Sequence, residues 1–241
     1  MTAAELKGSG DRHRGGWLRP LAIGLLAALL VVGTGVAIWR LVRHDHDSVA
    51  LAGRIADTSP VKMTIAGTPL DIPANMIRTA RQRRGGAMER VDLLLDWPDL
   101  TGYSTGNAGA FRSGSPIAPL LYVSILPADS PLDSTGRLDT VYSRFFSGDA
   151  LTGPSGLIGR TLSEDSGYGG EEIFYEPGAA KPFVARCIAR ATVEVPATCI
   201  RDVRIAPGLS MLYRFDRFYL GDWQAMDTGL GELAATFRAQ R

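Results

Sequence analysis

The longest run without a charged residue covers residues 20–39 and reads PLAIGLLAALLVVGTGVAIW. A helix needs about twenty apolar residues to cross roughly 30 Å of hydrocarbon. Trp17 and Trp39 flank the run, and aromatic rings of this kind favour the membrane interface. A buried core helix rarely lacks a polar side over so many turns, and a cleaved secretory signal has a shorter apolar region of about 7 to 15 residues. We therefore expect a single uncleaved signal-anchor helix that spans the membrane.

Beyond this run, alternation of apolar and polar residues predicts a series of β-strands. Residues 61–78 show it on both sides of a turn at Gly67, Thr68 and Pro69, which predicts a hairpin. Further strand-like runs are RVDLLLDW, LLYVSIL, GLIGRTL, EEIFYEP, FVARCIAR, ATCIRDVRI and LSMLYRFDRFYL. Glycine or proline separates most of the later runs, and connections this short join antiparallel neighbours.

Helical spacing occurs in two segments of the same region. Residues 133–146 repeat apolar side chains on one side and offer Asp133 or Ser134 as the N-cap. Residues 222–238 begin at the N-cap candidate Asp222 and continue with a core-packing stripe formed by Trp223, Met226, Leu230, Leu233 and Phe237. Together these elements predict an α+β domain in which a mainly antiparallel sheet carries two helices packed on one face.

The chain thus divides into four parts. We expect a disordered cytoplasmic tail over residues 1–19, the transmembrane signal-anchor helix over residues 20–39, a juxtamembrane stalk over residues 40–60 and the α+β domain over residues 61–241. Lys and Arg are similarly frequent on both sides of the apolar run, so the positive-inside rule barely orients it. Residues 44–241 hold 20 Lys and Arg against 23 Asp and Glu, a balance that disfavours binding to nucleic acid and other polyanions.

The chain has two cysteines, Cys187 and Cys199. All three histidines precede residue 47, which disfavours a zinc site, and the eleven residues between the cysteines exclude a C-x-x-C redox motif. Folding the flanking strands about ATVEVP places Cys187 directly opposite Cys199, at a distance that a disulfide tolerates. Such a bond persists in oxidising compartments. We therefore favour a domain in the periplasm, tethered to the cell inner membrane, over a cytoplasmic domain with two reduced thiols.

Four arginines, Arg78, Arg81, Arg83 and Arg84, lie within RTARQRRGG and form a local positive patch. The arginine fork suits phosphate and carboxylate groups, so anionic lipid head groups or the acidic face of a partner are ligands that this patch could bind. A solvated turn is the simpler interpretation, because the whole domain is rich in arginine.

Two other motifs also have simple interpretations. The segment TGYSTGNAGAFRSGSP lacks the lysine of a phosphate-binding loop, and we expect a flexible loop that could form a binding edge. The run HDHD at residues 44–47 offers imidazoles and carboxylates to a metal ion, but without further ligands a hydrated interfacial segment is favoured. Neither a metal site nor a cofactor is therefore predicted.

Carboxylates offer the one route to an enzyme. Glycoside cleavage needs two carboxyl groups about 5 to 10 Å apart, one of them with a raised pKa. The candidates are Glu171, Glu172 and Glu176 after SGYGG, and Asp92, Asp96 and Asp99 around RVDLLLDWPD. Such residues are ordinarily solvated or paired with arginine. Residues 48–241 hold no histidine and no cysteine outside the pair, which excludes Ser-His and Cys-His catalysis in the domain.

The sequence therefore favours a non-enzymatic accessory or interaction module of the cell envelope. Its expected partners are the inner membrane and a membrane protein. A carboxylate-dependent hydrolase acting on an envelope glycan is the alternative. A ligand-sensing subunit that relays through a membrane partner is the third hypothesis.

Overall fold

The computed structural model of the 241-residue chain describes residues 53–112, 117–192 and 195–238. The predicted cytoplasmic tail, the signal-anchor helix and the HDHD segment lie outside these residues and stay predictions. Within the described residues, no helix combines the length and the apolar character that a membrane crossing requires.

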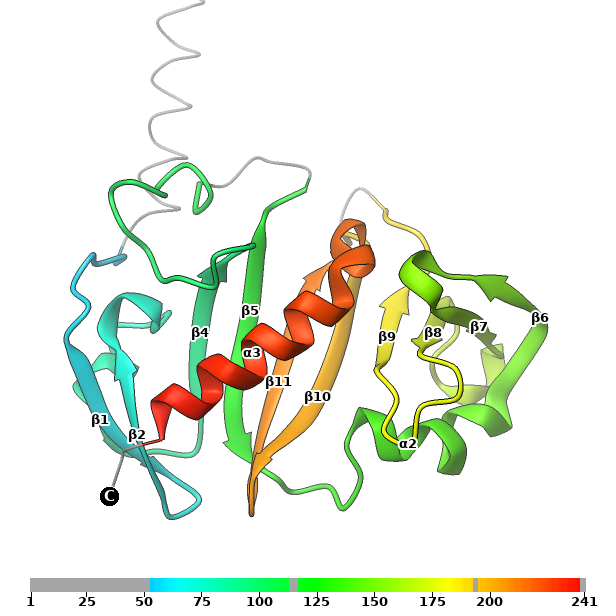
Figure 1. Cartoon of the computed structure of the whole chain (residues 1–241), viewed down its shortest axis with the longest axis horizontal. Coiled ribbons are helices and arrows are strands. Elements are labelled where there is room, and N and C mark those ends of the chain that lie inside the picture. Colours follow the sequence, from blue (N-terminus) through cyan, green and yellow to red (C-terminus); the bar gives the residue numbers. More distant parts are fainter. Residues whose placement is uncertain (1–52, 113–116, 193–194, 239–241) are drawn as a thin grey trace, which may run out of the picture. The chain divides into compact units, whose positions relative to one another are not determined.

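A large antiparallel sheet of eight strands dominates the domain (Figure 1). Every neighbouring pair is antiparallel, which confirms the sheet type that the short connections predict. Strand β6 was not predicted, because its FSGDALT segment is mostly exposed and its register shifts between Ser147 and Leu151. The strand order is β4 (Val91–Asp96), β5 (Leu120–Pro127), β11 (Leu209–Asp216), β10 (Thr198–Ala206), β9 (Val184–Ile188), β8 (Glu171–Tyr175), β7 (Ile158–Leu162) and β6 (Phe146–Thr152).

A small sheet holds the predicted hairpin. Strands β1 (Pro60–Ile65) and β2 (Thr68–Pro73) pair antiparallel, and the short β3 (Gly86–Ala87) pairs with β1. The turn consists of Ala66 and Gly67, both with positive φ, because Ile65 pairs with Thr68. Glycine tolerates this backbone conformation without steric cost, so Gly67 sets the turn one residue before the predicted position.

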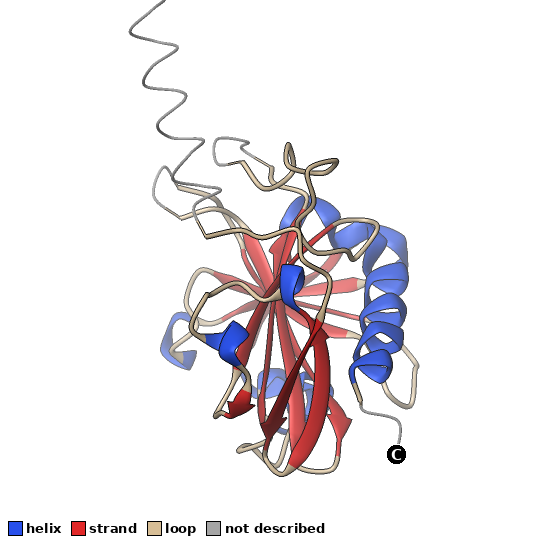
Figure 2. Cartoon of the chain, turned by 90° about the vertical axis from the view of Figure 1, so that its left-hand side faces the viewer, coloured by secondary structure: helices blue, strands red, loops and turns tan. Residues whose placement is uncertain are grey.

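Helix α3 (Trp223–Phe237) lies on one side of the large sheet (Figure 2). Its stripe at helical spacing is buried as predicted, except that Ala234 is buried while Leu233 is only partly covered. The main core lies between α3 and the two sheets, and joins Leu230 and Phe237 with Ile72 of β2 and Val123 of β5. Asp222 does not cap α3 through its side chain, since its carboxylate accepts from Trp97 Nε1 at 3.1 Å.

The second predicted helix is shorter than expected. Helix α2 (Ser134–Thr140) gives way to a 3-10 turn over Tyr142–Phe145, and β6 follows at once. Asp133 is its N-cap, as predicted, because the Asp133 carboxylate accepts from the backbone N–H of Gly136 at 2.9 Å.

The prediction that both helices pack on one face of the sheet is wrong. Neighbouring residues of a strand point to opposite faces. On β9, Ala185 and Cys187 belong to the core that α3 covers, whereas their neighbour Val184 lies in a separate cluster. The apolar residues of α2 and the following turn pack with Ile173 and Val184, outside the core that α3 covers. Periodicity identifies the apolar side of a helix but not the face of the sheet that receives it.

A buried polar cluster joins α3 to the large sheet. Arg201 is 5% exposed and donates from Nε and Nη2 to the two carboxylate oxygens of Asp227 at 2.9 and 3.1 Å. The hydroxyl of Tyr213 donates to Oδ1 of the same carboxylate at 2.7 Å. Burial, assisted by the negative charge of Asp227, raises the pKa of Tyr213 well above its ordinary value.

This pKa shift predicts a loss of stability in alkaline solution. The folded state holds the Tyr213 proton more tightly than the unfolded chain does. This difference contributes fully to the unfolding free energy below the ordinary pKa of 10.0, and the contribution is lost as the pH rises above that value. Above that pH, we expect the unfolding free energy of the wild type to fall more steeply than that of Tyr213→Phe, by up to about 1.4 kcal/mol per pH unit. Urea denaturation of both proteins from about pH 8 to about pH 11 measures the difference. If the unfolding free energies of the two proteins fall in parallel over this pH range, the prediction is contradicted.

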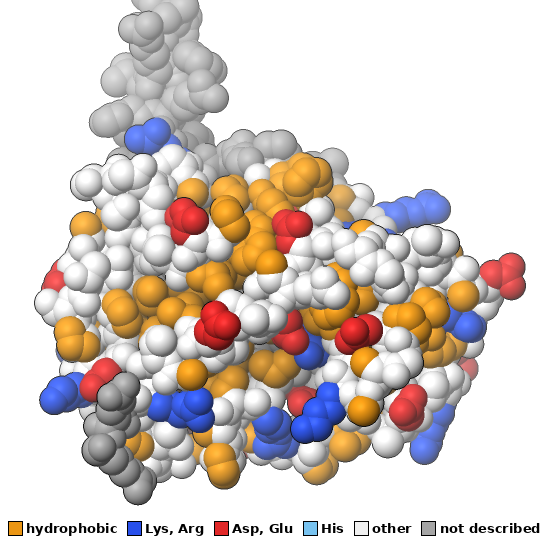
Figure 3. Space-filling model, in the orientation of Figure 1, with side chains coloured by type: hydrophobic (Ala, Val, Ile, Leu, Met, Phe, Trp, Pro, Cys, Tyr) orange, Lys and Arg blue, Asp and Glu red, His pale blue; other side chains and the backbone are white. Residues whose placement is uncertain are grey.

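The face of the domain that carries α3 presents charges of both signs (Figure 3). Acidic side chains lie across the middle of this face, most basic side chains lie below them, and apolar side chains are interspersed. Such a mixture is ordinary for a protein surface.

Candidate functional site

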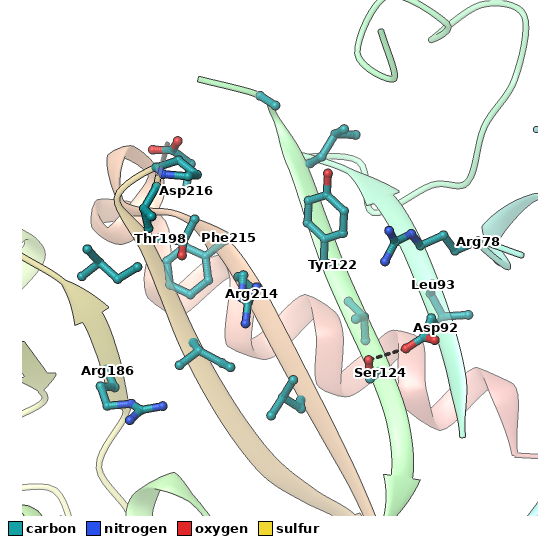
Figure 4. Close-up of a pocket in the computed structure, with 18 of the residues that line it drawn as sticks. Arg78, Asp92, Leu93, Tyr122, Ser124, Arg186, Thr198, Arg214, Phe215 and Asp216 are labelled. Carbon is teal, nitrogen blue, oxygen red and sulfur yellow. Dashed lines mark hydrogen bonds between the residues drawn. The ribbon is translucent and has the colours of Figure 1, made fainter. Parts of the chain in front are cut away.

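A groove of about 840 Å³ lies on the face of the large sheet opposite α3 (Figure 4). Glu171 of β8 lines one end of it, and its floor runs across the strands from Asp92 on β4 to Arg186 on β9. At about 4.8 Å per strand this distance is about 19 Å, the length of roughly six residues of extended chain. The groove is therefore large enough for a peptide segment.

Strand alternation decides which side chains line the groove. On β5, Leu121, Val123 and Ile125 are buried in the core, whereas Tyr122 and Ser124 face the groove. The same alternation on the neighbouring strands adds apolar side chains to the floor. These side chains are Leu126 of β5, Leu212 of β11, Ile200 of β10 and Ile188 of β9.

One row of cross-strand neighbours crosses the floor. Tyr122 pairs with Arg214, Arg214 pairs with Ile200, and Ile200 pairs with Arg186. Directly opposite residues of antiparallel strands have Cβ atoms about 5 Å apart. Aromatic, cationic and apolar groups thus succeed one another along the groove, and Tyr122 is 44% exposed.

Asp92 stands at the β4 end of the groove with its carboxylate fully engaged. It accepts from Arg90 Nη2 at 2.6 Å, from Ser124 Oγ at 2.7 Å and from Gln82 Nε2 at 3.1 Å. Burial by itself would raise the pKa of Asp92, but these hydrogen bonds and the Arg90 charge lower it. A glycosidase acid needs the opposite shift.

The other candidate carboxylates do not assemble with Asp92 into a catalytic pair. Glu171, the second acidic residue from the hydrolase hypothesis that lines the groove, is on β8 and pairs with Arg186 at 3.0 Å. Four strands separate β8 from β4, which is about 24 Å. Glycosidase carboxyl groups are about 5 to 10 Å apart. Glu172 pairs with Arg217, Glu176 accepts from the Phe183 N–H, and Asp99 is exposed.

Asp96 organises the glycine-rich loop that follows β4. It is 7% exposed, and its Oδ1 accepts from the backbone N–H and the hydroxyl of Thr101 at 2.9 and 2.7 Å. Its Oδ2 accepts from Asn107 Nδ2 at 2.9 Å. Phe111 of the same loop packs on Leu94 and Leu120. The described part of this loop is thus held by side-chain hydrogen bonds and apolar packing, and Ala118 near its end lines the groove together with Leu120 of β5.

The four arginines singled out in the sequence have different surroundings. Arg83 donates to the backbone oxygens of Ile77 and Gly53 at 2.8 and 2.6 Å, so it holds the chain in place. Arg81 and Arg84 are exposed at the two ends of a short 3-10 segment, as the N-cap and the last residue of Gln82–Arg84. Arg78 lines the groove, and its guanidinium carbon lies 5.6 Å from the ring centre of Tyr122.

Arg54 adds positive charge near Arg78. Burial, followed by the charges of Arg78 and Arg83, lowers the pKa of the Arg54 guanidinium, and the nearby Tyr122 opposes this effect. Neighbouring guanidinium groups disfavour the charged form of Arg54, so positive charge gathers at this end of the groove. Within the described ranges, no three His, Cys, Asp or Glu side chains gather in a way that could hold a metal ion.

The predicted disulfide is confirmed. Cys187 and Cys199 are directly opposite one another on β9 and β10, are joined by a disulfide bond and are fully buried on the α3 side of the sheet. The bond therefore cross-links two central strands but does not itself line the groove.

Tyr122 and Arg214 are among the groove residues that the sequence interpretation missed. The signal was present in the alternation of LLYVSIL and LSMLYRFD, where both residues occupy positions that point away from the buried set. Their position side by side depends on the pairing of β5 with β11, two strands that are distant in the chain.

No protein-family model matches this chain, and no curated protein sequence does. Among solved structures, an immunity protein of the Stenotrophomonas maltophilia type IV secretion system is 16% identical with a TM-score of 0.52, over 76% of this chain and 94% of that chain. The iron-regulated outer membrane lipoprotein FrpD of Neisseria meningitidis is 12% identical with a TM-score of 0.49, over 78% of this chain and 98% of that chain. The domain therefore shares its fold with the immunity protein.

Proposed function

We propose that this chain is a membrane-tethered, non-enzymatic binding module of the cell envelope, and that its groove receives an extended segment of a partner protein. The observation that carries the proposal is the open face of the large sheet, where apolar side chains lie beside arginines and an exposed tyrosine. Contiguous apolar surface of this kind on a folded domain commonly marks an interaction site.

The composition of the groove supports a protein partner. Tyrosine and arginine are among the residue types enriched in the energetically dominant parts of protein interfaces. Here Tyr122, Arg214 and Arg186 lie in one row with the apolar Ile200 between the two arginines. Apolar contact would supply affinity, and the charged groups would select the partner and its register.

The proposed location is the cell inner membrane, with the domain in the periplasm. The apolar run at residues 20–39 supports a membrane anchor. The disulfide supports an oxidising compartment, because cytosolic reductants keep most thiols reduced. Both arguments lead to a domain that meets its partner close to the membrane surface.

Site-specific photo-crosslinking tests the binding function. A photoreactive amino acid at Leu212, on the groove floor, should yield a discrete crosslinked species in the cells that naturally produce the protein. The same amino acid at Gln224, exposed on α3 at the other face, is the matched control and should not yield it. The partner identified by mass spectrometry is then purified, and its affinity for the full-length protein is measured.

An acidic residue on the groove floor should weaken that affinity. We expect Ile200→Asp to raise the dissociation constant at least about tenfold, because a charge would be placed against apolar partner surface. Leu212→Gln provides a second test if the first variant does not fold. The proposal fails if both variants bind the purified partner as the wild type does, or if Gln224 crosslinks the same species as Leu212.

A further inference from the structure

Two guanidinium groups flank Tyr122 in the groove. Arg78 approaches the ring from the β4 side, with 5.6 Å between its guanidinium carbon and the ring centre. Arg214 is the cross-strand neighbour of Tyr122 on β11, on the other side of the ring. Figure 4 shows Tyr122 between these two arginines. All three side chains are exposed to solvent.

These two charges lack the carboxylate partners that neighbouring arginines have. Asp92 binds Arg90, and Glu171 binds Arg186. The third acidic residue of the groove, Asp216, accepts from the backbone N–H of Phe218 at 2.8 Å. Within the described part of the chain, Arg78 and Arg214 form no ion pair and no side-chain hydrogen bond. Among the described residues, the groove therefore holds two guanidinium groups, one on either side of an aromatic ring, that are not paired with a carboxylate.

We infer that Arg78 and Arg214 form a carboxylate clamp across Tyr122, which recognises an Asp or Glu side chain in the segment of the partner that occupies the groove. This inference rests on the proposed binding function and specifies its chemistry. A guanidinium fork matches the two oxygens of a carboxylate, and the ring of Tyr122 limits the directions that the Arg78 side chain can adopt.

The surroundings favour a carboxylate over a phosphate group. Phosphate sites are commonly built from free backbone N–H groups at helix N-termini and in glycine-rich turns. Here Tyr122 and Arg214 belong to inner strands, each of which pairs with a strand on both sides, so their backbone donors serve the sheet. The apolar floor beside the clamp, with Leu126, Leu212 and Ile200, fits a protein segment in which an acidic residue stands next to apolar ones.

A random hexapeptide library displayed on phage tests the clamp, because the groove spans about six extended residues. The full-length protein in nanodiscs of neutral phosphatidylcholine is the target. We expect selected peptides to combine Asp or Glu with large apolar residues. The best peptide should bind at least about tenfold more tightly than its analogue with Gln in place of Glu or Asn in place of Asp, given the strength of charge-assisted hydrogen bonds.

Matched arginine variants assign the effect to the clamp. The double variant Arg78→Gln, Arg214→Gln should bind the acidic peptide and its amide analogue equally, while the selection for apolar residues continues. The double variant Arg81→Gln, Arg84→Gln removes the same charge from exposed positions outside the groove and should keep the preference for the acidic peptide.

The outcomes separate the clamp from the binding function on which it rests. If selected peptides are apolar without acidic residues, or if the clamp variant keeps the acidic preference, the clamp is wrong and the groove still binds peptide. If no peptide is enriched over the bare nanodisc, the proposed function fails. If inorganic phosphate displaces the peptide at lower concentration than acetate does, the clamp recognises phosphate, and the inference is overturned.

Discussion

Replacing Asp227 by alanine is expected to lower the unfolding free energy of the domain by about 3 kcal/mol, because it leaves a buried arginine without its counter-charge. Arg201 is 5% exposed and directs two N–H groups at the Asp227 carboxylate. Tyr213 would lose its acceptor as well. Burial lowers the pKa of Arg201, and the interactions with Tyr213 and Asp227 more than offset this effect, so the charge stays in place. Urea denaturation measures the loss.

Two further variants test the cause of this effect. Glu232→Ala removes the same charge from an exposed position of the same helix and should change stability by less than about 0.5 kcal/mol. The double variant Arg201→Met, Asp227→Leu removes both charges and should be less destabilised than Asp227→Ala, since no buried charge is left unpaired. A double variant as unstable as the single one would mean that the carboxylate acts through packing and not through charge.

The second large effect is expected from the disulfide. Replacing Cys187 and Cys199 together by alanine should lower the unfolding free energy by about 3 kcal/mol, because the cross-link closes a short loop and restricts the unfolded chain. The two residues are 12 apart in sequence and are both fully buried in the main core. Denaturation with and without a reducing agent separates the cross-link from packing. The reductant should destabilise the wild type and leave the variant unchanged.

The same cysteines test the proposed periplasmic location. When the protein is taken from intact cells and denatured, a maleimide-polyethylene glycol reagent should modify neither cysteine before reduction and both cysteines after it. Immediate labelling of both cysteines would place the domain in a reducing compartment and would remove the main support for the proposed topology. The unfolding experiment would stand in either case, because it depends on the bond in the purified protein.

Local patterns in the sequence predicted most of the strands and both helices. Alternation in LLYVSIL corresponds to β5, because a strand with one buried face repeats every two residues. RVDLLLDW corresponds to β4, which is buried almost throughout because Phe111 covers Leu94. Cys187 and Cys199 could be placed opposite each other from their own flanking strands, since a single hairpin fixes that register. Strand β6 carries no such pattern and is mostly exposed, so nothing in its residues indicated its place at the sheet edge.

Contacts between distant segments decided the candidate site. RTARQRRGG suggested one patch of four arginines, yet Arg83 binds backbone oxygens and Arg78 faces the groove. The sequence offers Asp92 and Asp96 as possible catalytic carboxyl groups of a glycosidase. In the structure, Asp92 accepts from Arg90 and Ser124, and Asp96 supports the loop after β4. These roles follow from partners that the sequence does not place.

By itself, the sequence determined the α+β class of the domain, its antiparallel strands and its cysteine pair, because each depends on residues close together in the chain. The tertiary structure alone decided that α2 and α3 serve opposite faces of the sheet and that β5 pairs with β11. That pairing brings Tyr122 beside Arg214, 92 positions later in the chain. Strand order is set by packing of the whole core, so no local pattern of residues could have placed these two side chains in one groove.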